Sequence, residues 1–217
     1  MIFRKKAIAC PISFQSMPLS TPIEDLTFIV FDTETTGFNV GADDRLIEIG
    51  AVPIRGLKVV EEDIFQTYVN PKRQISQEII ELTSITQEKV ERAPEALQAI
   101  EDFFYYIKKR EAVSLVGHYV SFDSLVFTNE LKRAKCSLKG LQTLDTLDLI
   151  GYIAPSYDMR DLERYARAFG TRMYERHSAI GDALTTAFLF TELLHLFRIR
   201  GGNTWGELIQ SVSKSGT

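Results

Sequence analysis

The chain has 217 residues, 45% of them hydrophobic and 25% charged, which is ordinary for a globular protein with one α/β domain. Its formal net charge of −4 argues against a broad duplex-DNA-binding surface, because such surfaces are usually basic. It does not exclude a protein that holds a few nucleotides, since bound divalent cations invert the local charge of an acidic site. We find no run of about 20 apolar residues, the length of a membrane helix, and therefore expect no membrane contact.

The first 25 residues are expected to form an N-terminal arm, either laid along the domain or mobile, because prolines at 11, 18 and 22 interrupt regular structure. Three basic residues near the start precede an apolar patch that is too short for the core of a signal peptide. We therefore expect a cytoplasmic protein. The two cysteines, Cys10 and Cys136, fit that compartment, where we expect no disulfide between them.

Three strands are predicted in the first third of the chain. The apolar run at 27–31 is rich in β-forming residues and predicts a buried central strand. Residues 45–55 and 58–69 predict a second and a third strand, with a hairpin turn at 55–57. Consecutive strands with short links favour an antiparallel meander.

The pattern then changes to a helical period. Helices are predicted over 76–82, 94–109, 121–134, 144–153, 159–169 and 178–198, with a further buried strand over 113–116. Strands followed by helices interleaved with another strand predict an α/β fold, a mixed β-sheet flanked by α-helices. We place the folded domain at residues 26–200 and a C-terminal tail at 201–217.

The first acidic cluster lies at the end of the predicted central strand. Side chains alternate along a strand, so Asp32 and Glu34 point to the same side. Two adjacent carboxylates repel unless a positive charge lies between them, and a divalent cation with oxygen ligands is the natural occupant. Exposed loop acids are the alternative, but the buried strand before them favours a metal site.

The second acidic position, Asp123, follows the predicted strand 113–116 and the pair His118 and Tyr119. Ser121 is a candidate N-cap for the helix that begins there. Asp123 would then lie in the first turn, where the helix dipole favours an acid. Because a capping role alone accounts for this acid, a functional role depends on the other clusters.

The third cluster contains His177 and Asp182. Asp182 lies in a predicted helix that is apolar nearly all round, and such a helix is largely buried. A buried carboxylate without a partner is costly, and a metal ion would supply one. His177 fits the loop that leads into this helix, from which it can lean over the metal.

Together, in this order, these motifs resemble the DEDDh family of 3′→5′ exonucleases, which have the ribonuclease-H-like fold. The resemblance covers residues 26–200 and rests on F-D-T-E-T-T-G at 31–37, L-I-E-I-G-A-V at 46–52 and H-x-A-x-x-D-A at 177–183. Residues 82–86 (L-T-S-I-T) are similar to the L-T-G-I-T segment of the polymerase III proofreading domains. One departure is Tyr119, where the family usually has asparagine, and it bears on substrate handling near that loop.

The resemblance implies an enzyme that removes nucleotides from the 3′ ends of single-stranded DNA or RNA and releases nucleoside 5′-monophosphates. Two divalent ions, Mg²⁺ or Mn²⁺, would stabilise the attacking and leaving oxygens. Asp32, Glu34 and Asp182 would hold one ion. Asp32 would also bridge to the second ion, which Asp123 would support largely through water. His177 would accept a proton from the attacking water.

Three further residues are expected at the substrate. Thr35 and Thr36 would contact the terminal nucleotide, and Phe38 would stack on or wedge against a base, with a core role for Phe38 as the alternative. Five arginines just before His177 could guide a phosphate backbone, although interleaved acids favour a salt-bridged surface for most of them: Arg160, Arg164, Arg167, Arg172 and Arg176.

Two alternatives stay open. The first is an exoribonuclease acting on RNA ends or short oligonucleotides, since no residue identifies a group that would read the 2′-hydroxyl. The second is a non-catalytic module that binds single strands or a polymerase, which the presence of all five motif residues disfavours. The sequence contains no polymerase region, so proofreading would require a polymerase subunit as a partner.

Overall fold

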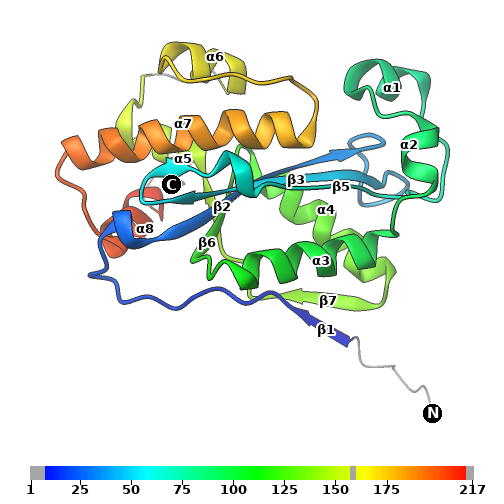
Figure 1. Cartoon of the computed structure of the whole chain (residues 1–217), viewed down its shortest axis with the longest axis horizontal. Helices are drawn as coiled ribbons and strands as arrows, with labels where there is room; N and C mark the ends of the chain where they lie inside the picture. The colour runs from blue at the N-terminus through cyan, green and yellow to red at the C-terminus, as the bar shows by residue number, and fades with distance from the viewer. Residues whose placement is uncertain (1–7, 157–159, 214–217) are drawn as a thin grey trace.

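The computed structural model describes residues 8–156 and 160–213. Within them, six strands form one mixed sheet in the order β4-β3-β2-β6-β8, with β5 also pairing with β3 (Figure 1). Strand β2 is antiparallel to β3 and parallel to β6, and β8 continues the parallel part. The bounds are β2 (Thr27–Thr35), β3 (Leu46–Arg55), β4 (Lys58–Val59), β5 (Phe65–Tyr68), β6 (Ser114–Gly117) and β8 (Thr143–Asp145).

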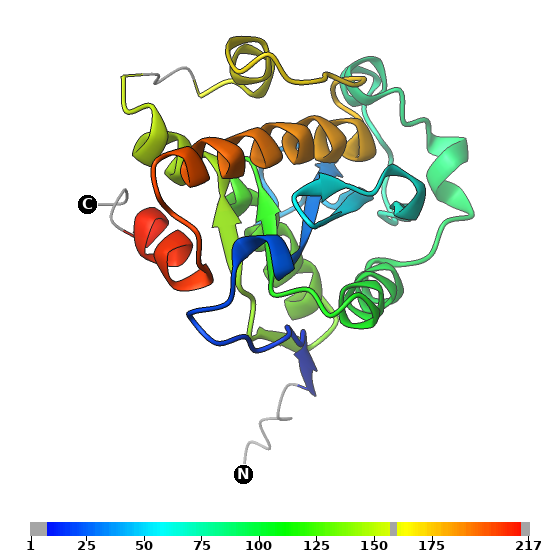
Figure 2. The ribbon, with the colours of Figure 1, turned by 60° about the vertical axis from the view of Figure 1, so that its left-hand side comes forward.

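Helices cover both faces of this sheet. Helix α7 lies along one face, and α3 and α4 lie on the other (Figures 1 and 2). The helices are α1 (Gln77–Thr83), α2 (Gln87–Glu91), α3 (Ala96–Lys109), α4 (Val120–Arg133), α5 (Thr146–Ile153), α6 (Leu162–Ala168), α7 (Ala179–Ile199) and α8 (Trp205–Ser213). The predicted mixed sheet flanked by helices is therefore confirmed.

The alternation of side chains along β2 divides the interior into two cores. Phe28 and Val30 belong to the core under α7, whereas Ile29 and Phe31 belong to the core under α3 and α4. By the same alternation, Asp32 and Glu34 lie on the α7 side, and Thr33 lies on the α4 side. The strand thus presents its two acids to α7.

The predicted third strand, 58–69, is wrong as a continuous element. It is divided into β4 and β5 by a short 3-10 helix, Glu61–Asp63. Asp63 is held by Arg110, which directly follows α3, and the Tyr106 hydroxyl donates to its backbone oxygen at 2.6 Å. Both short strands still pair antiparallel with β3, so the meander itself is present.

Both ends of the described chain pack on the domain. Residues before the predicted boundary at 26 include β1 (Ile8–Pro11), which pairs in parallel with β7 (Cys136–Lys139), and a buried Ile23. Helix α8 occupies the predicted C-terminal tail, and Trp205 and Leu208 lie in the core under α7. Backbone N–H groups of Ile23 and Trp205 donate to carbonyls of Asn203 and Thr21, so the two ends hold each other.

The strongest helix prediction, 178–198, corresponds to α7. This helix has 21 residues and is, by length and composition alone, apolar enough to cross a membrane. The expectation that no stretch is long and apolar enough for a membrane span is therefore wrong at α7. Since 61% of the most apolar stretch of α7 is buried inside the structure, α7 has the character of a core helix. The other predicted late helix, 159–169, is α6, and residue 159 lies outside the described residues.

Candidate active site

Three of the predicted acids come together where β2 ends against the start of α7. Carboxylate oxygens of Asp32, Glu34 and Asp182 all lie within 4.8 Å of one another. Asp182 is buried, and the two strand acids are half-buried. The ladder between β2 and β3 shifts register between Glu34 and Thr35, so regular pairing ends beside this cluster.

Two glycines allow close packing at the start of α7. A Cβ atom on Gly50 of β3 would lie 2.3 Å from the backbone of Ala179 and Ile180. A Cβ atom on Gly181 would lie 2.0 Å from the backbone oxygen of Glu175. A side chain at Gly50 would push α7 away from β3, so this glycine keeps Asp182 within reach of the strand acids, whereas Gly181 lets the segment at Glu175 lie against the start of the helix.

Glu48 also fixes the start of α7. It lies opposite Glu34 in the β2–β3 ladder and is buried, 1% exposed. Its Oε2 accepts a hydrogen bond of 2.9 Å from the backbone N–H of Ala179, and Gln66 donates to its Oε1 at 2.7 Å. A carboxylate from the sheet therefore satisfies a free N–H at the N-terminus of α7. The role of Glu48 was not predicted, because its partner is 131 residues away.

Asp123 joins the cluster from α4. Its Oδ1 accepts a hydrogen bond of 2.6 Å from Thr33, the β2 residue between the two strand acids. The predicted cap Ser121 is wrong: the N-cap of α4 is Tyr119, with a left-handed φ of 61°. Asp145 supplies the capping carboxylate and accepts from the N–H groups of Tyr119 and Val120. Such a cap comes from across the fold and leaves no local sequence signal.

The negative charge of each acid in the cluster makes ionisation of the neighbouring acids less favourable. Burial, followed by repulsion from Asp123 and Asp182, raises the pKa of Asp32 well above its usual range. Burial and then Asp182 raise the pKa of Glu34 to about 8. Burial raises the pKa of Asp123 to about 7, and it also raises the pKa of Asp182, against the effect of Arg176. The cluster is thus poised to take up positive charge.

His177 and Arg176 lie in the turn before α7. The N–H of His177 donates to Asp182 Oδ2 at 3.2 Å, and the residue has a left-handed φ of 59°. The guanidinium of Arg176 donates to Asp182 Oδ1. Other arginines of the predicted group are paired on the surface: Arg167 with Glu163, and Arg172 with Glu61. The salt-bridged surface is confirmed for those two, whereas Arg176 belongs to the site.

A cavity of about 280 Å³ opens at the cluster. Asp32, Glu34, His177 and Asp182 line it together with Thr35 and Phe38. The Phe38 ring is 87% exposed and lies 5.9 Å from the ring of Phe122, so a core role for Phe38 is excluded. Among the described residues, Thr36 does not line this cavity. Its N–H donates to the Arg45 carbonyl and its hydroxyl donates to Asp44, so it shapes the loop instead.

The remaining wall comes from residues that were not predicted for the site. Ile79, Leu82 and Thr83 of α1 and Phe122 of α4 line the cavity. The L-T-S-I-T resemblance at 82–86 was the available signal for α1. Phe122 had none of its own, because it is recognised only through its contact with Phe38.

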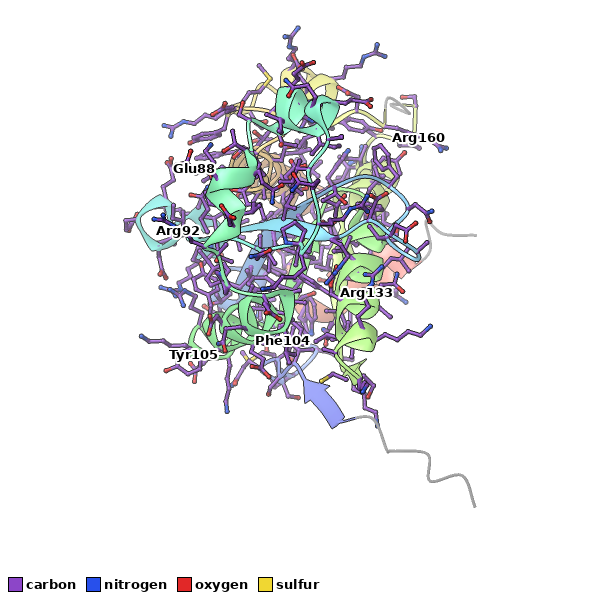
Figure 3. The ribbon with its side chains drawn as sticks, turned by 90° about the vertical axis from the view of Figure 1, so that its right-hand side faces the viewer. Glu88, Arg92, Phe104, Tyr105, Arg133 and Arg160 are labelled. Carbon is purple, nitrogen blue, oxygen red and sulfur yellow. The ribbon has the colours of Figure 1, made fainter. Side chains whose placement is uncertain are left out.

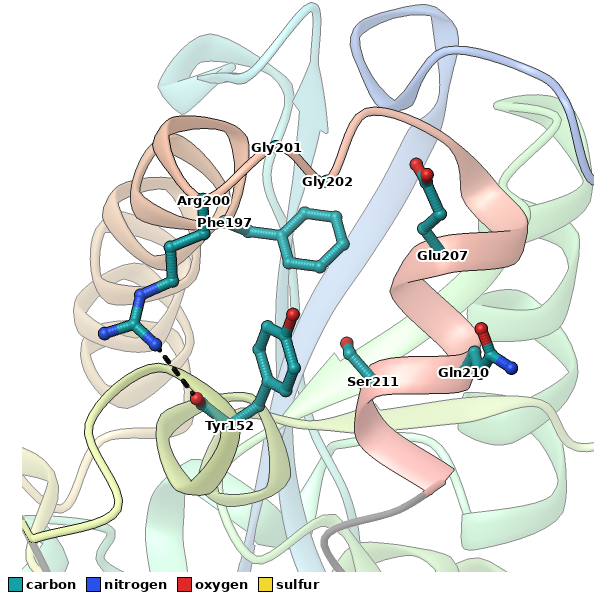
Figure 4. A pocket seen from close by; sticks show the side chains of 8 residues that line it. All are labelled: Tyr152, Phe197, Arg200, Gly201, Gly202, Glu207, Gln210 and Ser211. Carbon is teal, nitrogen blue, oxygen red and sulfur yellow. Dashed lines mark hydrogen bonds between the residues drawn. The ribbon is translucent and has the colours of Figure 1, made fainter.

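A separate cavity of about 260 Å³ lies between α5, the end of α7 and α8 (Figure 4). The rings of Tyr152 and Phe197 form one side, and Glu207, Gln210 and Ser211 of α8 form the other. Arg200 is tied to the Tyr152 carbonyl at 3.3 Å. None of the clustered acids lines this cavity, so it belongs to another part of the fold.

The cluster fits a hard divalent cation. Mg²⁺ and Mn²⁺ prefer carboxylate oxygens, and three such oxygens converge here from rigid elements. The raised pKa values of the same acids express a repulsion that a cation would remove. The donor set and the electrostatics therefore agree.

Comparison with known proteins places the chain in a family. The exonuclease family model that is named for RNase T matches residues 29–190. The chain is 32% identical over 200 residues to the DNA polymerase III PolC-type protein of Bacillus subtilis, covering 89% of this chain and 13% of that protein. It is 34% identical over 208 residues to a DNA polymerase III subunit epsilon-like protein of Rhodobacter capsulatus, covering 93% and 28%. The chain thus spans less than a third of the length of either relative.

Solved structures share the fold. The nuclease domain of 3′hExo, a DEDDh family member bound to rAMP, has a TM-score of 0.72 at 20% identity and covers 81% of this chain and 94% of that one. Exonuclease X in complex with 5′ overhanging duplex DNA has a TM-score of 0.63 at 19% identity, covering 85% and 99%. The exonuclease family model covers most of this chain and the fold agrees with it, so this chain belongs to the exonuclease family.

Proposed function

We propose that the protein degrades DNA from single-stranded 3′ ends, one nucleotide at a time, by hydrolysis assisted by two divalent ions. The observation that carries this is the convergence of Asp32, Glu34 and Asp182 within 4.8 Å at the floor of a cavity. The cavity, at about 280 Å³, lies just below the usual range of ligand pockets, roughly 300–1,000 Å³, which suits a single terminal nucleotide better than a longer strand.

Each residue has a defined task in this proposal. Asp32, Glu34 and Asp182 would hold one Mg²⁺ or Mn²⁺ ion, and Asp32 with Asp123 a second. The ions would supply charge stabilisation to the attacking and leaving oxygens. His177, which lines the same cavity, would take a proton from the attacking water. Thr33 orients Asp123 through its hydrogen bond.

Residues of the cavity wall would contact the substrate. Thr35 and Phe38 would contact the last nucleotide, and the exposed Phe38 ring offers a face for a base. Thr36 would act on the substrate through the shape of its loop.

The choice of DNA rests on the two relatives described above, which are 32% and 34% identical and are both named as DNA polymerase III proteins. They also support a polymerase subunit as a partner and a role in proofreading or repair. The main alternative, an exoribonuclease, draws on fold neighbours such as the 3′-exonuclease described for the histone mRNA stem-loop, with a TM-score of 0.67. We also place the protein in the cytoplasm, where Cys136 would remain the free thiol that the structure has.

The test is digestion of matched DNA and RNA oligonucleotides, each labelled at either the 3′ or the 5′ end. The proposal predicts immediate release of a 3′-labelled mononucleotide from DNA, a ladder from the 5′-labelled strand, and complete loss of both in EDTA, with recovery in Mg²⁺ or Mn²⁺. Faster degradation of RNA would favour the alternative, and release of a 5′ label first would refute the polarity.

A further inference from the structure

The loop between β2 and β3, residues 36–45, is held in place by hydrogen bonds that depend on one buried carboxylate, that of Glu130. Glu130 is only 3% exposed, although it is an acid in the second half of α4. It lies seven residues after Asp123, about two helical turns, so the same face of α4 bears both acids. One acid reaches the catalytic cluster, and the other reaches the loop.

Both oxygens of Glu130 accept hydrogen bonds. Oε1 accepts from Arg45 Nε at 2.8 Å, from the N–H of Leu46 at 3.2 Å and from Arg133 Nη1 at 3.2 Å. Oε2 accepts from Arg45 Nη2 at 2.8 Å. A buried carboxylate with two guanidinium partners and a backbone partner is a strong, directional anchor.

Arg45 and Arg133 connect Glu130 to the loop. Arg133 on α4 (Figure 3) donates through Nη2 to the carbonyls of Val40 and Ala42, both at 2.7 Å. The N–H of Arg45 donates to the Thr36 hydroxyl at 3.0 Å. The tip and the base of the loop are thus both tied to Glu130.

A second carboxylate, that of Asp44, lies within the loop and holds it further. Asp44 accepts from the Thr36 hydroxyl, from the N–H of Asn39 at 2.9 Å and from Arg73. Phe38, between these fixed points, is 87% exposed and lines the catalytic cavity. The hydrogen-bonded loop therefore holds the Phe38 ring in water. The ring loses its exposed area only when a ligand covers it.

We propose that Glu130, acting through Arg45 and Arg133, is a positioning residue that fixes Phe38 as the wall for the terminal base and so sets the affinity for nucleotide substrates. The inference rests on the proposed nuclease function. It assigns Glu130 no part in phosphodiester hydrolysis itself.

The test compares two substrates. An oligonucleotide whose 3′-terminal residue is abasic has a phosphodiester without a terminal base, whereas the matched short DNA oligonucleotide contains both the ester and the base. Glu130→Gln should raise KM for the oligonucleotide about fivefold or more, the lower end of a base–aromatic contact, and leave kcat and the Mn²⁺-dependent rate on the baseless ester unchanged. Unchanged KM, or an equal loss on both substrates, would overturn the proposal.

A matched control exists in the same molecule. Asp63 is also held by two arginines, Arg55 and Arg110, but it lies outside the residues that line the cavity. Asp63→Asn should lower thermal stability and leave KM unchanged. If Glu130→Gln does not fold, Arg133→Gln decides the question, because it removes only the bonds to the loop tip and one bond to Glu130.

A double-mutant cycle tests the route through Phe38. If Glu130 acts by placing that ring, Glu130→Gln should add nothing to the KM of Phe38→Ala. Additive effects would overturn the proposal. Failure of the native protein to hydrolyse either substrate would instead refute the proposed function, so the two failures are distinguishable.

Discussion

Arg176 donates a hydrogen bond to Asp182 Oδ1, an oxygen of a carboxylate proposed to bind a divalent ion. A guanidinium and a cation repel, so the two compete for this acid. Arg176→Gln should therefore bind Mn²⁺ about tenfold more tightly in a calorimetric titration, since a like charge within a few Å is worth on the order of 1 kcal/mol or more. Arg172→Gln, which removes an arginine paired with Glu61, is the control. Equal or weaker affinity in Arg176→Gln would contradict the competition.

The raised pKa values of the cluster predict how stability depends on pH. Glu34, with a pKa of about 8, and Asp123, with a pKa of about 7, hold their protons more tightly when folded than their ordinary values near 4 allow when unfolded. The folded state then binds more protons, so the free energy of unfolding falls as pH rises from about 4.5 to about 8. In EDTA, the Tm from calorimetry should decline over this range.

Divalent ions should reverse that decline. They bind the deprotonated acids, so the increase in Tm on adding Mg²⁺ should be larger at pH 8 than at pH 5.5. Glu34→Gln should flatten the slope in EDTA, because one titrating group is removed. A Tm in EDTA that rises across this range would show that the acids are not held in their protonated form.

Asp182→Asn removes the negative charge of the side chain and keeps its shape. The amide keeps the shape of the side chain and one oxygen that can accept from either Arg176 or the His177 N–H, so the fold should be kept with one of the two hydrogen bonds lost. Turnover should fall at least ~100-fold, because metal catalysis supplies several kcal/mol. Glu192→Gln, another half-buried acid on α7, controls for loss of a charge from the same helix. Near-normal turnover in Asp182→Asn would mean that Asp182 is an ordinary helix acid.

His177→Ala should lower the single-turnover rate roughly 10²–10⁴-fold, the range for loss of a general base. Mn²⁺ affinity should be almost unchanged, because carboxylates hold the ions, whereas Asp32→Ala should lose both affinity and rate. His177 has a φ of 59°, which asparagine tolerates, so His177→Asn separates loss of the imidazole from backbone strain. His195→Ala, an exposed histidine of α7, is the control. Much weaker Mn²⁺ binding in His177→Ala would make His177 a ligand.

Ser84→Gly should stabilise the fold. Ser84 ends α1 with a left-handed φ of 58°, at the position where the similar L-T-G-I-T segment has glycine. Relief of that conformation is worth about 1 kcal/mol, and the Tm should rise by ~2–4 °C for a domain of this size. Ser84→Ala keeps the strain and should show no increase. A lower Tm for Ser84→Gly would indicate that the serine has a compensating contact.

The parts that the sequence predicted are those with a long local pattern. The alternation through Asp32 and Glu34 placed both acids on one side of β2, and the apolar run after His177 predicted α7 to within one residue at each end. The family resemblance then supplied the grouping of distant acids that no local pattern contains.

The parts that were missed depend on contacts across the fold. Asp145 caps α4 from another strand, and Glu48 reaches the start of α7, so neither follows from its neighbours in sequence. Strand β8 has only three residues, too few for a reliable period, and α8, expected as a tail, becomes visible only through Trp205 in the core. The strand expected over 58–69 failed because Asp63 turns toward Arg110.

The catalytic cavity is built on two cores of unequal size. Its acid side depends on α7, whose Phe190 and Leu193 belong to a large core, whereas the α1 side rests on a small cluster of Ile47, Ile75, Ile85 and Val90. Free energies of local opening follow the apolar contacts that must be broken. The α1 wall should therefore open at a lower free energy than the acid side, and under the proposed function it is the side by which a nucleotide would enter and leave.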